Sequence, residues 1–253
     1  MTIVTVHGTF ARNWLIRKFY GGRGWWHANS YFCQKLLEKI PGCAFVEFEW
    51  SGKNSHSARI AAGAELARLL TLIRREKPNE NVVVIAHSHG GNVALKAIDV
   101  AEPGSVLFLF LLGMPHLSIF CQKPVACDSK VEGVAHTCGG TTCHWLYWGD
   151  AVNRVGNGIW GFYSLNDAVQ GFVARVYTGL PLRMKLRLPG KLEVMRHYFP
   201  PDCPGITNIV VDMKSRERVG LLGRLIHWDA IKEHNALHSR AMAVKIAEII
   251  ATK

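Results

Sequence analysis

The sequence predicts an α/β fold in which a mostly parallel central sheet carries helices on both faces. Strand-like and helix-like segments alternate along the 253 residues, an order typical of right-handed β-α-β units. Apolar runs at 82–85 and 106–112 are typical of strands buried on both faces. The chain is also 49% hydrophobic, enough for a sizeable core. We therefore expect ligands to bind at the carboxyl ends of the strands.

In the first third of the chain, apolar spacing and turn residues predict two strands and two helices. Residues 1–6 are apolar and β-branched and run into a turn. Residues 30–40 have apolar side chains at helical spacing and stop at Pro-Gly, whereas 44–50 alternate like a half-exposed strand. Residues 57–76 are predicted to form a long helix. Its buried stripe is expected to consist of Ile60, Ala64, Ala67 and residues 70–73.

The rest of the chain continues the alternation. The predicted elements are a strand at 81–86, a helix at 91–100, strands at 105–112, 159–163 and 206–211, and an amphipathic helix at 235–250. Residues 114–157 are rich in Gly, Cys and His and show no clear period, so we expect an insertion there. The chain is expected to be one domain spanning 1–253, with 10–31 and 114–157 as cap-like or lid-like insertions.

Four of the seven cysteines lie between Cys121 and Cys143, beside several histidines. A zinc site would need close pairs such as C-x2-C, but five, ten and four residues separate these thiols. Ordinary thiols in an inserted loop are therefore favoured over a metal or disulfide cluster.

The chain is basic, because 30 Lys and Arg residues against 19 Asp and Glu residues leave a formal charge of +11. This balance suits nucleic acid, an anionic membrane surface or acidic substrates, but no nucleic-acid-binding motif supports the first. Residues 10–31 mix aromatic and basic side chains, and predict either a lid that meets anionic lipid or a cap packed onto the core. Residues 182–188 alternate basic and apolar side chains, like a strand with one basic face.

No apolar stretch approaches the roughly 20 residues that a membrane-spanning helix needs. The first ten residues lack the charged leader, apolar block and cleavage site of a signal peptide. We expect a cytoplasmic protein, with leaderless secretion left open.

The clearest chemical motif is Ala86-His87-Ser88-His89-Gly90-Gly91, between a buried strand and a helix. A nucleophile elbow needs small residues two positions before and two after the serine, because the backbone turns sharply there. Such a turn exposes the serine hydroxyl at the amino terminus of the helix, where developing negative charge is stabilised. The alternative is a plain serine helix cap.

A second motif, His7-Gly8-Thr9, ends the first strand. Acyl transfer needs two backbone donors aimed at the oxyanion, and the amides of Thr9 and His89 are the candidates. His7 is expected to be structural and to help fix the loop. An ordinary strand-end turn is the alternative.

Together these motifs resemble the α/β-hydrolase superfamily, in particular its small bacterial lipases and esterases. The resemblance covers nearly the whole chain: V-H-G-T at 6–9, A-H-S-H-G-G at 86–91, G-M-P-H at 113–116, Y-S-L-N-D-A-V at 163–169 and His-Ser at 238–239. The departures are Ala86, where the elbow usually has glycine, and Met114, where these lipases often have threonine. The resemblance implies the α/β-hydrolase fold and a triad in the chain order Ser, acid, His.

The resemblance assigns this triad to Ser88, Asp167 and His238. Asp167 fits the family position of the acid, although aspartate is also common as a helix cap. Asp212 is the second candidate for the acid, and Asp150 is the least favoured.

His238 is favoured as the base because Ser239 follows it, as in the family's His-Ser pair. His234, one helical turn earlier, and His227 are the other candidates. The implied reaction is hydrolysis of a small-molecule or lipid ester through an acyl-enzyme on Ser88, with no metal or organic cofactor. Thioester or amide hydrolysis by the same residues stays open, as does a non-catalytic module that binds membranes or protein partners.

Overall fold

A computed structural model describes most of the chain. The described residues are 1–9, 24–121, 134–138, 141–145, 150–164, 191–195, 205–211 and 237–253, and the structural statements that follow concern these residues.

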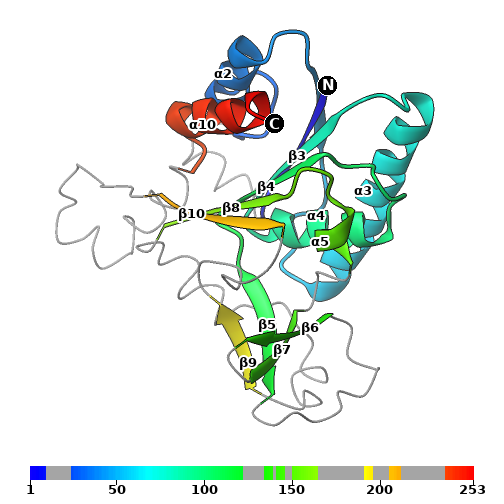
Figure 1. Cartoon of the computed structure of the whole chain (residues 1–253), viewed down its shortest axis with the longest axis vertical. Helices are drawn as coiled ribbons and strands as arrows, with labels where there is room; N and C mark the ends of the chain where they lie inside the picture. Colours follow the sequence, from blue (N-terminus) through cyan, green and yellow to red (C-terminus); the bar gives the residue numbers. More distant parts are fainter. Residues whose placement is uncertain are drawn as a thin grey trace, which may run out of the picture.

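Six parallel strands form the central sheet, in the order β10-β8-β4-β3-β1-β2 (Figure 1). Their bounds are β1 Thr2–Val6, β2 Ala44–Phe48, β3 Val82–His87, β4 Phe108–Leu112, β8 Ile159–Tyr163 and β10 Ile206–Val210. Every neighbouring pair is parallel. The predicted α/β class is therefore confirmed, because parallel neighbours need crossover connections that place helices over the sheet.

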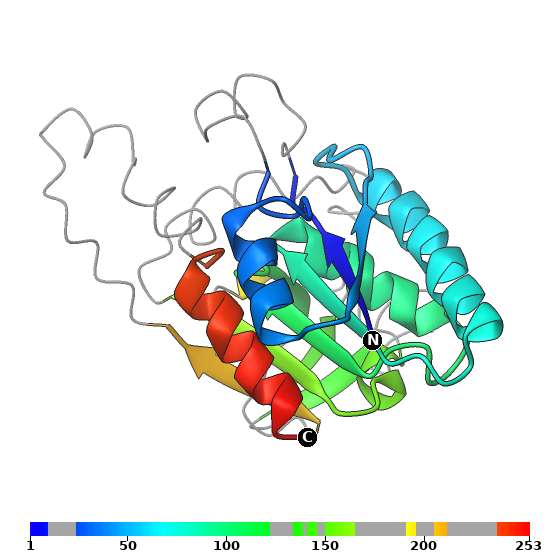
Figure 2. The same ribbon diagram turned by 90° about the horizontal axis from the view of Figure 1, so that it is seen from above.

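Helices cover both faces of this sheet. The helices α3 (His56–Glu76), α4 (His89–Val100) and α5 (Ala151–Arg154) lie on one face, whereas α2 (Tyr31–Lys39) and α10 (Arg240–Ala251) lie side by side on the other (Figures 1 and 2). Each face has its own apolar core cluster. As a result, α2 and α10 form one layer although they stand at opposite ends of the sequence.

The predicted helix boundaries were close but not identical. The α4 helix begins at His89 rather than at 91, directly after the turn at Ser88. The α10 helix begins at Arg240 rather than at 235, because the Ser239 side chain accepts a hydrogen bond from the Met242 amide and caps it. Consequently His238 precedes the helix instead of lying within it.

The buried stripe of α3 overlaps the predicted one only in part. Ala67 and Leu70 are buried as predicted, but Ala62 and Leu66 are buried too, whereas Ile60 is only partly buried and Leu72 is 50% exposed. Apolar residues occur on both sides of the stripe in this sequence, so periodicity alone did not identify its centre. Packing against α4 decided it.

A smaller antiparallel sheet follows β4, with the order β6-β7-β5-β9. Its strands are β5 (His116–Cys121), β6 (Val134–Cys138), β7 (Thr141–Trp145) and β9 (Lys191–Met195), and it lies below the main sheet in Figure 1. The sequence predicted an insertion without a clear period at 114–157, where β5, β6 and β7 form. The strands are short, and polar residues such as those of T-T-C-H-W in β7 weaken the apolar alternation.

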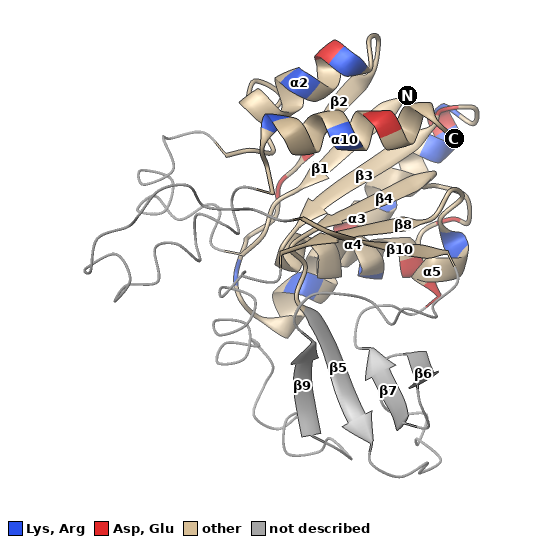
Figure 3. Ribbon diagram, turned by 60° about the vertical axis from the view of Figure 1, so that its left-hand side comes forward, with Lys and Arg blue, Asp and Glu red and all other residues tan. Residues whose placement is uncertain are grey.

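Charged side chains lie mainly on the helices and loops rather than on the sheet (Figure 3). The strands β1, β3, β4, β8 and β10 contain no charged residue. Within the described ranges, no helix is both long and apolar enough to span a membrane. The basic stretch at 182–188 lies outside the described residues.

Candidate active site

The turn at Ser88 has the strained geometry of a nucleophile elbow. Ser88 lies between the last residue of β3 and the first residue of α4, with φ 51° and ψ −134°. It is the one non-glycine residue with positive φ in the described part of the chain. Its amide donates to the Leu112 carbonyl of β4 at 2.9 Å, which anchors the turn to the sheet. Such a conformation is costly for a serine and is typical of a site where strain serves the chemistry.

Two glycines let neighbouring backbones approach the elbow closely. A Cβ on Gly90 would lie 2.5 Å from the His7 carbonyl oxygen and 2.6 Å from that of Val6. A Cβ on Gly8 would lie 2.8 Å from the Ser88 Cβ. The end of β1 therefore packs directly against the elbow, and only glycine fits at these two contacts.

The same contacts bring both predicted oxyanion donors, the amides of Thr9 and His89, to the carboxyl edge of the sheet beside the elbow. Thr9 follows Gly8, and His89 is the first residue of α4, where the helix dipole favours negative charge. The His89 ring is buried and turned inward, because its Nδ1 accepts from Asn92 Nδ2 at 3.1 Å and Asn92 also donates to the Pro115 carbonyl.

His7 holds the first loop, as predicted for a structural residue. It is fully buried, and its Nε2 accepts from the Trp50 amide at 3.4 Å while its Nδ1 donates to the Gly8 carbonyl at 2.9 Å. An amide can only donate, so this arrangement requires the neutral ring with its proton on Nδ1. The Trp50 indole N–H also donates to the His7 carbonyl at 2.7 Å.

His238 lies beside the elbow. Its ring centroid is 4.0 Å from that of His87, the residue before Ser88, at an interplanar angle of 77°. The Trp25 indole stacks on His238 at 4.4 Å with an angle of only 5°. Phe32 of α2 approaches the same ring edge-on at 6.4 Å. The structure thus brings the elbow and the predicted base together at the carboxyl edge of the sheet.

The segment at 24–28 packs onto the body of the protein. Trp26 is buried, and its carbonyl accepts from the Thr5 hydroxyl of β1 at 2.7 Å. Trp25 lies against Phe32 and His87. For these residues the prediction of aromatics packed on the core describes the arrangement, whereas residues 10–23 lie outside the described part.

Several candidates for the acid and the base fall outside the described residues: Asp167, Asp212, His227 and His234. Asp150 is described, and it caps the short α5 helix, which precedes β8 at the opposite edge of the sheet. Hydrogen bonds from Asn153 and then Arg154 lower the pKa of its carboxyl group. Asp150 is therefore engaged away from Ser88.

Sequence reasoning missed the aromatic neighbours of the histidine, Trp25 and Phe32. The signal was present in the aromatic stretch at 10–31, but nothing in the sequence indicated contact with a residue some two hundred positions later. Only packing of α2 against α10 brings them together.

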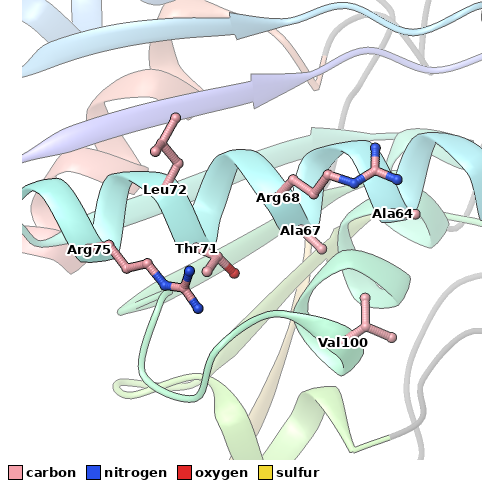
Figure 4. A pocket seen from close by; sticks show the side chains of 7 residues that line it. All are labelled: Ala64, Ala67, Arg68, Thr71, Leu72, Arg75 and Val100. Carbon is pink, nitrogen blue, oxygen red and sulfur yellow. The ribbon is translucent and has the colours of Figure 1, made fainter.

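A cavity of about 380 Å³ lies away from this site, between α3 and the end of α4 (Figure 4). Arg68 and Arg75 extend from α3 beside it, and Val100 of α4 lines it. Because Val100 ends α4 and Ser88 precedes its first residue, the cavity is at the far end of that helix from the elbow. No cluster of three or more metal-ligating side chains occurs among the residues that the structure describes.

The sequence matches one family model and several solved structures. Residues 47–101 match the family described as "Alpha/beta hydrolase of unknown function (DUF900)". A Xanthomonas campestris pv. campestris protein described as a hydrolase of the alpha/beta superfamily is 12% identical, with 100% of this chain and 99% of that one covered and a TM-score of 0.44. No curated protein matches.

Two fungal proteins show a partial likeness. A cutinase-like protein from Cryptococcus sp. is 15% identical, over 45% of this chain and 52% of that one, with a TM-score of 0.34. A Trichoderma reesei cutinase in complex with a phosphonate inhibitor is 13% identical, over 45% and 51%, with a TM-score of 0.33. The match therefore spans about half the length of either cutinase.

The matched family segment contains β3, the elbow and α4, which are the elements that build the site. The six-stranded parallel sheet has helices on both faces, and its third strand along the chain delivers a serine in a strained turn before a helix. The chain therefore combines a six-stranded parallel α/β sheet with a segment, residues 47–101, that is similar to an alpha/beta-hydrolase family and carries the strand, the strained turn and the helix.

Proposed function

We propose that this chain is a serine hydrolase that cleaves carboxylic ester bonds through an acyl-enzyme on Ser88. The observation that supports it most strongly is the elbow itself: a serine held at φ 51° between β3 and α4, with the His238 ring against the residue before it. A helix-capping serine would adopt ordinary extended angles, as Ser30 and Ser55 do.

In the proposed reaction, His238 takes the Ser88 proton as the hydroxyl attacks the ester carbonyl. The amides of Thr9 and His89 then stabilise the oxyanion, and each such donor contributes about 3 kcal/mol in related chemistry. His238 returns the proton to the leaving alcohol, and water hydrolyses the acyl-enzyme. Asp167 is the proposed acid that orients His238, because the Ser, acid, His order needs a carboxylate between the other two.

The proposed substrate is a small-molecule or lipid ester. The formal charge of +11 is consistent with approach to anionic lipid, so an anionic membrane surface is the proposed partner. Neither proposal requires a metal or an organic cofactor.

The test compares wild type with Ser88→Ala on a panel of short-chain p-nitrophenyl esters, a thioester and an anilide. Ser88→Ala should lower kcat on esters by at least about a thousandfold, because the nucleophile is lost. Ser51→Ala, which removes an exposed serine from the loop after β2, is the matched control and should keep full activity.

A fluorophosphonate probe gives a second readout, since it labels an activated serine without turnover. Labelling should occur in wild type and vanish in Ser88→Ala. Equal ester turnover by both proteins, or no turnover and no labelling by either, would contradict the proposal. A clear preference for the thioester or the anilide would replace the ester assignment while keeping Ser88 as the nucleophile.

A further inference from the structure

We propose that Trp25 is a positioning residue for the base: its indole face holds the His238 ring in the orientation needed at Ser88 and stabilises the imidazolium that forms during acyl transfer. This inference rests on the proposed function of Ser88 and His238. It adds a residue from the segment before α2, far from both in sequence.

The geometry of the ring pair is that of a flat stack. The centroids of Trp25 and His238 are 4.4 Å apart and the planes differ by 5°, so the imidazole lies over the face of the indole. Tryptophan has the strongest cation–π interaction of the aromatic side chains, and the interaction grows when the pair is shielded from water. A stack of this kind favours the charged form of the imidazole through the face of its ring.

Two further rings approach His238 edge-on. The His87 ring is 4.0 Å away at 77°, and the Phe32 ring is 6.4 Å away at 84°. Because one neighbour covers a face and the other two cross the plane nearly at right angles, rotation of the imidazole would collide with an aromatic ring. Holding a reacting group in one orientation is a major source of rate enhancement.

Trp25 is itself firmly held. Its carbonyl accepts hydrogen bonds from the Ser30 hydroxyl at 2.5 Å and from the Cys33 thiol at 3.2 Å. Its ring packs edge-on against Phe32 at 5.4 Å. Ser30 is also the N-cap of α2, and α2 packs against α10, which begins two residues after His238. Ser30 therefore fixes Trp25 to the start of α2, and the packing of α2 on α10 places this tryptophan next to His238.

The titratable groups around this stack come from three elements. His87 approaches from the end of β3, and the Cys33 thiol from α2 is kept neutral because burial raises its pKa to about 12. Arg240 of α10 is drawn to the exposed Tyr31 ring, at 4.7 Å from its centroid.

The first experiment detects the stack without catalysis. In a Ser88→Ala background, histidine-selective labelling gives the His238 ring resonance, which is assigned by its loss in His238→Gln. The indole ring current should shift this resonance upfield. Trp25→Leu should return it toward the position of an exposed histidine, whereas Trp160→Leu, which removes a partly buried tryptophan of the same core cluster from β8, should not move it. An unchanged resonance in Trp25→Leu would overturn the stack.

The second experiment measures the positioning role in the Ser88 enzyme. Trp25→Leu should lower kcat by about 10- to 100-fold with little change in KM, because a small misplacement of the base affects the reaction more than binding. Trp25→Phe keeps an aromatic face and should recover much of the loss. Thermal unfolding of each variant identifies misfolded protein. If Trp25→Leu does not fold, the kcat of Trp25→Phe is compared with that of wild type instead.

The two proposals fail in different ways. A folded Trp25→Leu variant with wild-type kcat would overturn the positioning role and leave Ser88 as the nucleophile. Absence of Ser88-dependent turnover in wild type would overturn the catalytic assignment, and the positioning role with it, although the resonance experiment would still show whether the rings stack.

Discussion

The elbow at Ser88 and the predicted base His238 lie at the same edge of the sheet, but the regions that position them are built differently. The elbow region, residues 82–100, is a continuous strand–turn–helix unit, so a few neighbouring bonds and the missing Cβ of Gly90 set the serine's position. The histidine region, residues 24–39 and 237–251, joins two segments from opposite ends of the chain. His238 is placed by ring contacts between these segments and with the elbow.

This difference predicts two kinds of response to substitution. Changes in the elbow region should reduce stability and activity together, because the same close contacts join β1, β3 and α4. Changes in the histidine region should reduce activity more than stability, because a helix can remain docked while the residue just before it shifts.

The largest effect is expected from Gly90→Ala, whose new Cβ would lie 2.5 Å from the His7 carbonyl oxygen. Backbone cannot yield there without separating α4 from β1, so the loss of unfolding free energy should reach the upper part of about 1–3 kcal/mol. Turnover should fall as well. Urea unfolding and ester kinetics measure the two effects.

Gly63→Ala in α3 is the comparison variant, because its new Cβ would lie 2.9 Å from Cγ and 3.0 Å from Cβ of Lys96 but no closer than 3.4 Å to a backbone oxygen, that of Val93. Both glycines are helical, and an alanine in a helix interior gains about 1 kcal/mol of propensity. Gly63→Ala should therefore lose clearly less unfolding free energy than Gly90→Ala, because a side chain can shift where a backbone carbonyl cannot. Equal losses in the two variants would show that the close approach at Gly90 is not what holds the elbow.

A smaller effect on stability is expected from Ser239→Ala, which removes the cap of α10 directly after His238. The Ser239 side chain accepts from the Met242 amide at 3.2 Å, and loss of such a cap costs about 1 kcal/mol. Because the first turn of α10 would loosen beside the base, kcat should fall several-fold with KM unchanged.

Ser55→Ala removes the equivalent cap of α3, whose Ser55 side chain accepts from the Ala58 amide at 3.2 Å. It should cost a similar amount of stability and leave kcat unchanged. Thermal unfolding and steady-state kinetics on the pair separate the two regions. A similar drop in kcat for Ser239→Ala and Ser55→Ala would show that the cap beside His238 has no special effect on activity.

The smallest effect concerns Glu47 of β2, which fastens the histidine region to the edge of the sheet. Its carboxylate accepts from the Ala28 amide at 2.7 Å and from His27 at 2.6 Å. Burial alone would raise the pKa of Glu47, but these hydrogen bonds outweigh it and lower the pKa. The folded pKa lies below the unfolded value of about 4.3, so this contribution to stability is present above that pH and is lost as the pH falls through the folded pKa.

The unfolding free energy should therefore decline less steeply with acidification in Glu47→Gln than in wild type, between about pH 6 and pH 3. Glu65→Gln removes an exposed carboxylate from α3 and should follow the wild-type curve. If the unfolding free energies of wild type and Glu47→Gln fell in parallel with pH, the Glu47 carboxylate would not be what holds the segment at 24–28.

The sequence predicted the elbow region well because its signals are local. Four consecutive aliphatic residues at 82–85 indicated a buried strand, and β3 covers them. The small residues around Ser88 indicated the sharp turn that its φ of 51° confirms. The start of α10 was predicted five residues too early, because apolar spacing continued upstream of the cap.

The sequence by itself determined the α/β class and the strand–turn–helix at Ser88, since motif spacing and short-range periodicity carry that information, whereas the choice of His238 as the candidate base came from the resemblance of its His-Ser pair to that of the α/β hydrolases. Tertiary structure alone decided that His238 lies against His87, that Trp25 stacks on its ring and that α2 and α10 share a layer. The physical reason is that such contacts arise from the burial of apolar surface between segments whose separation along the chain leaves no periodic or spacing signal.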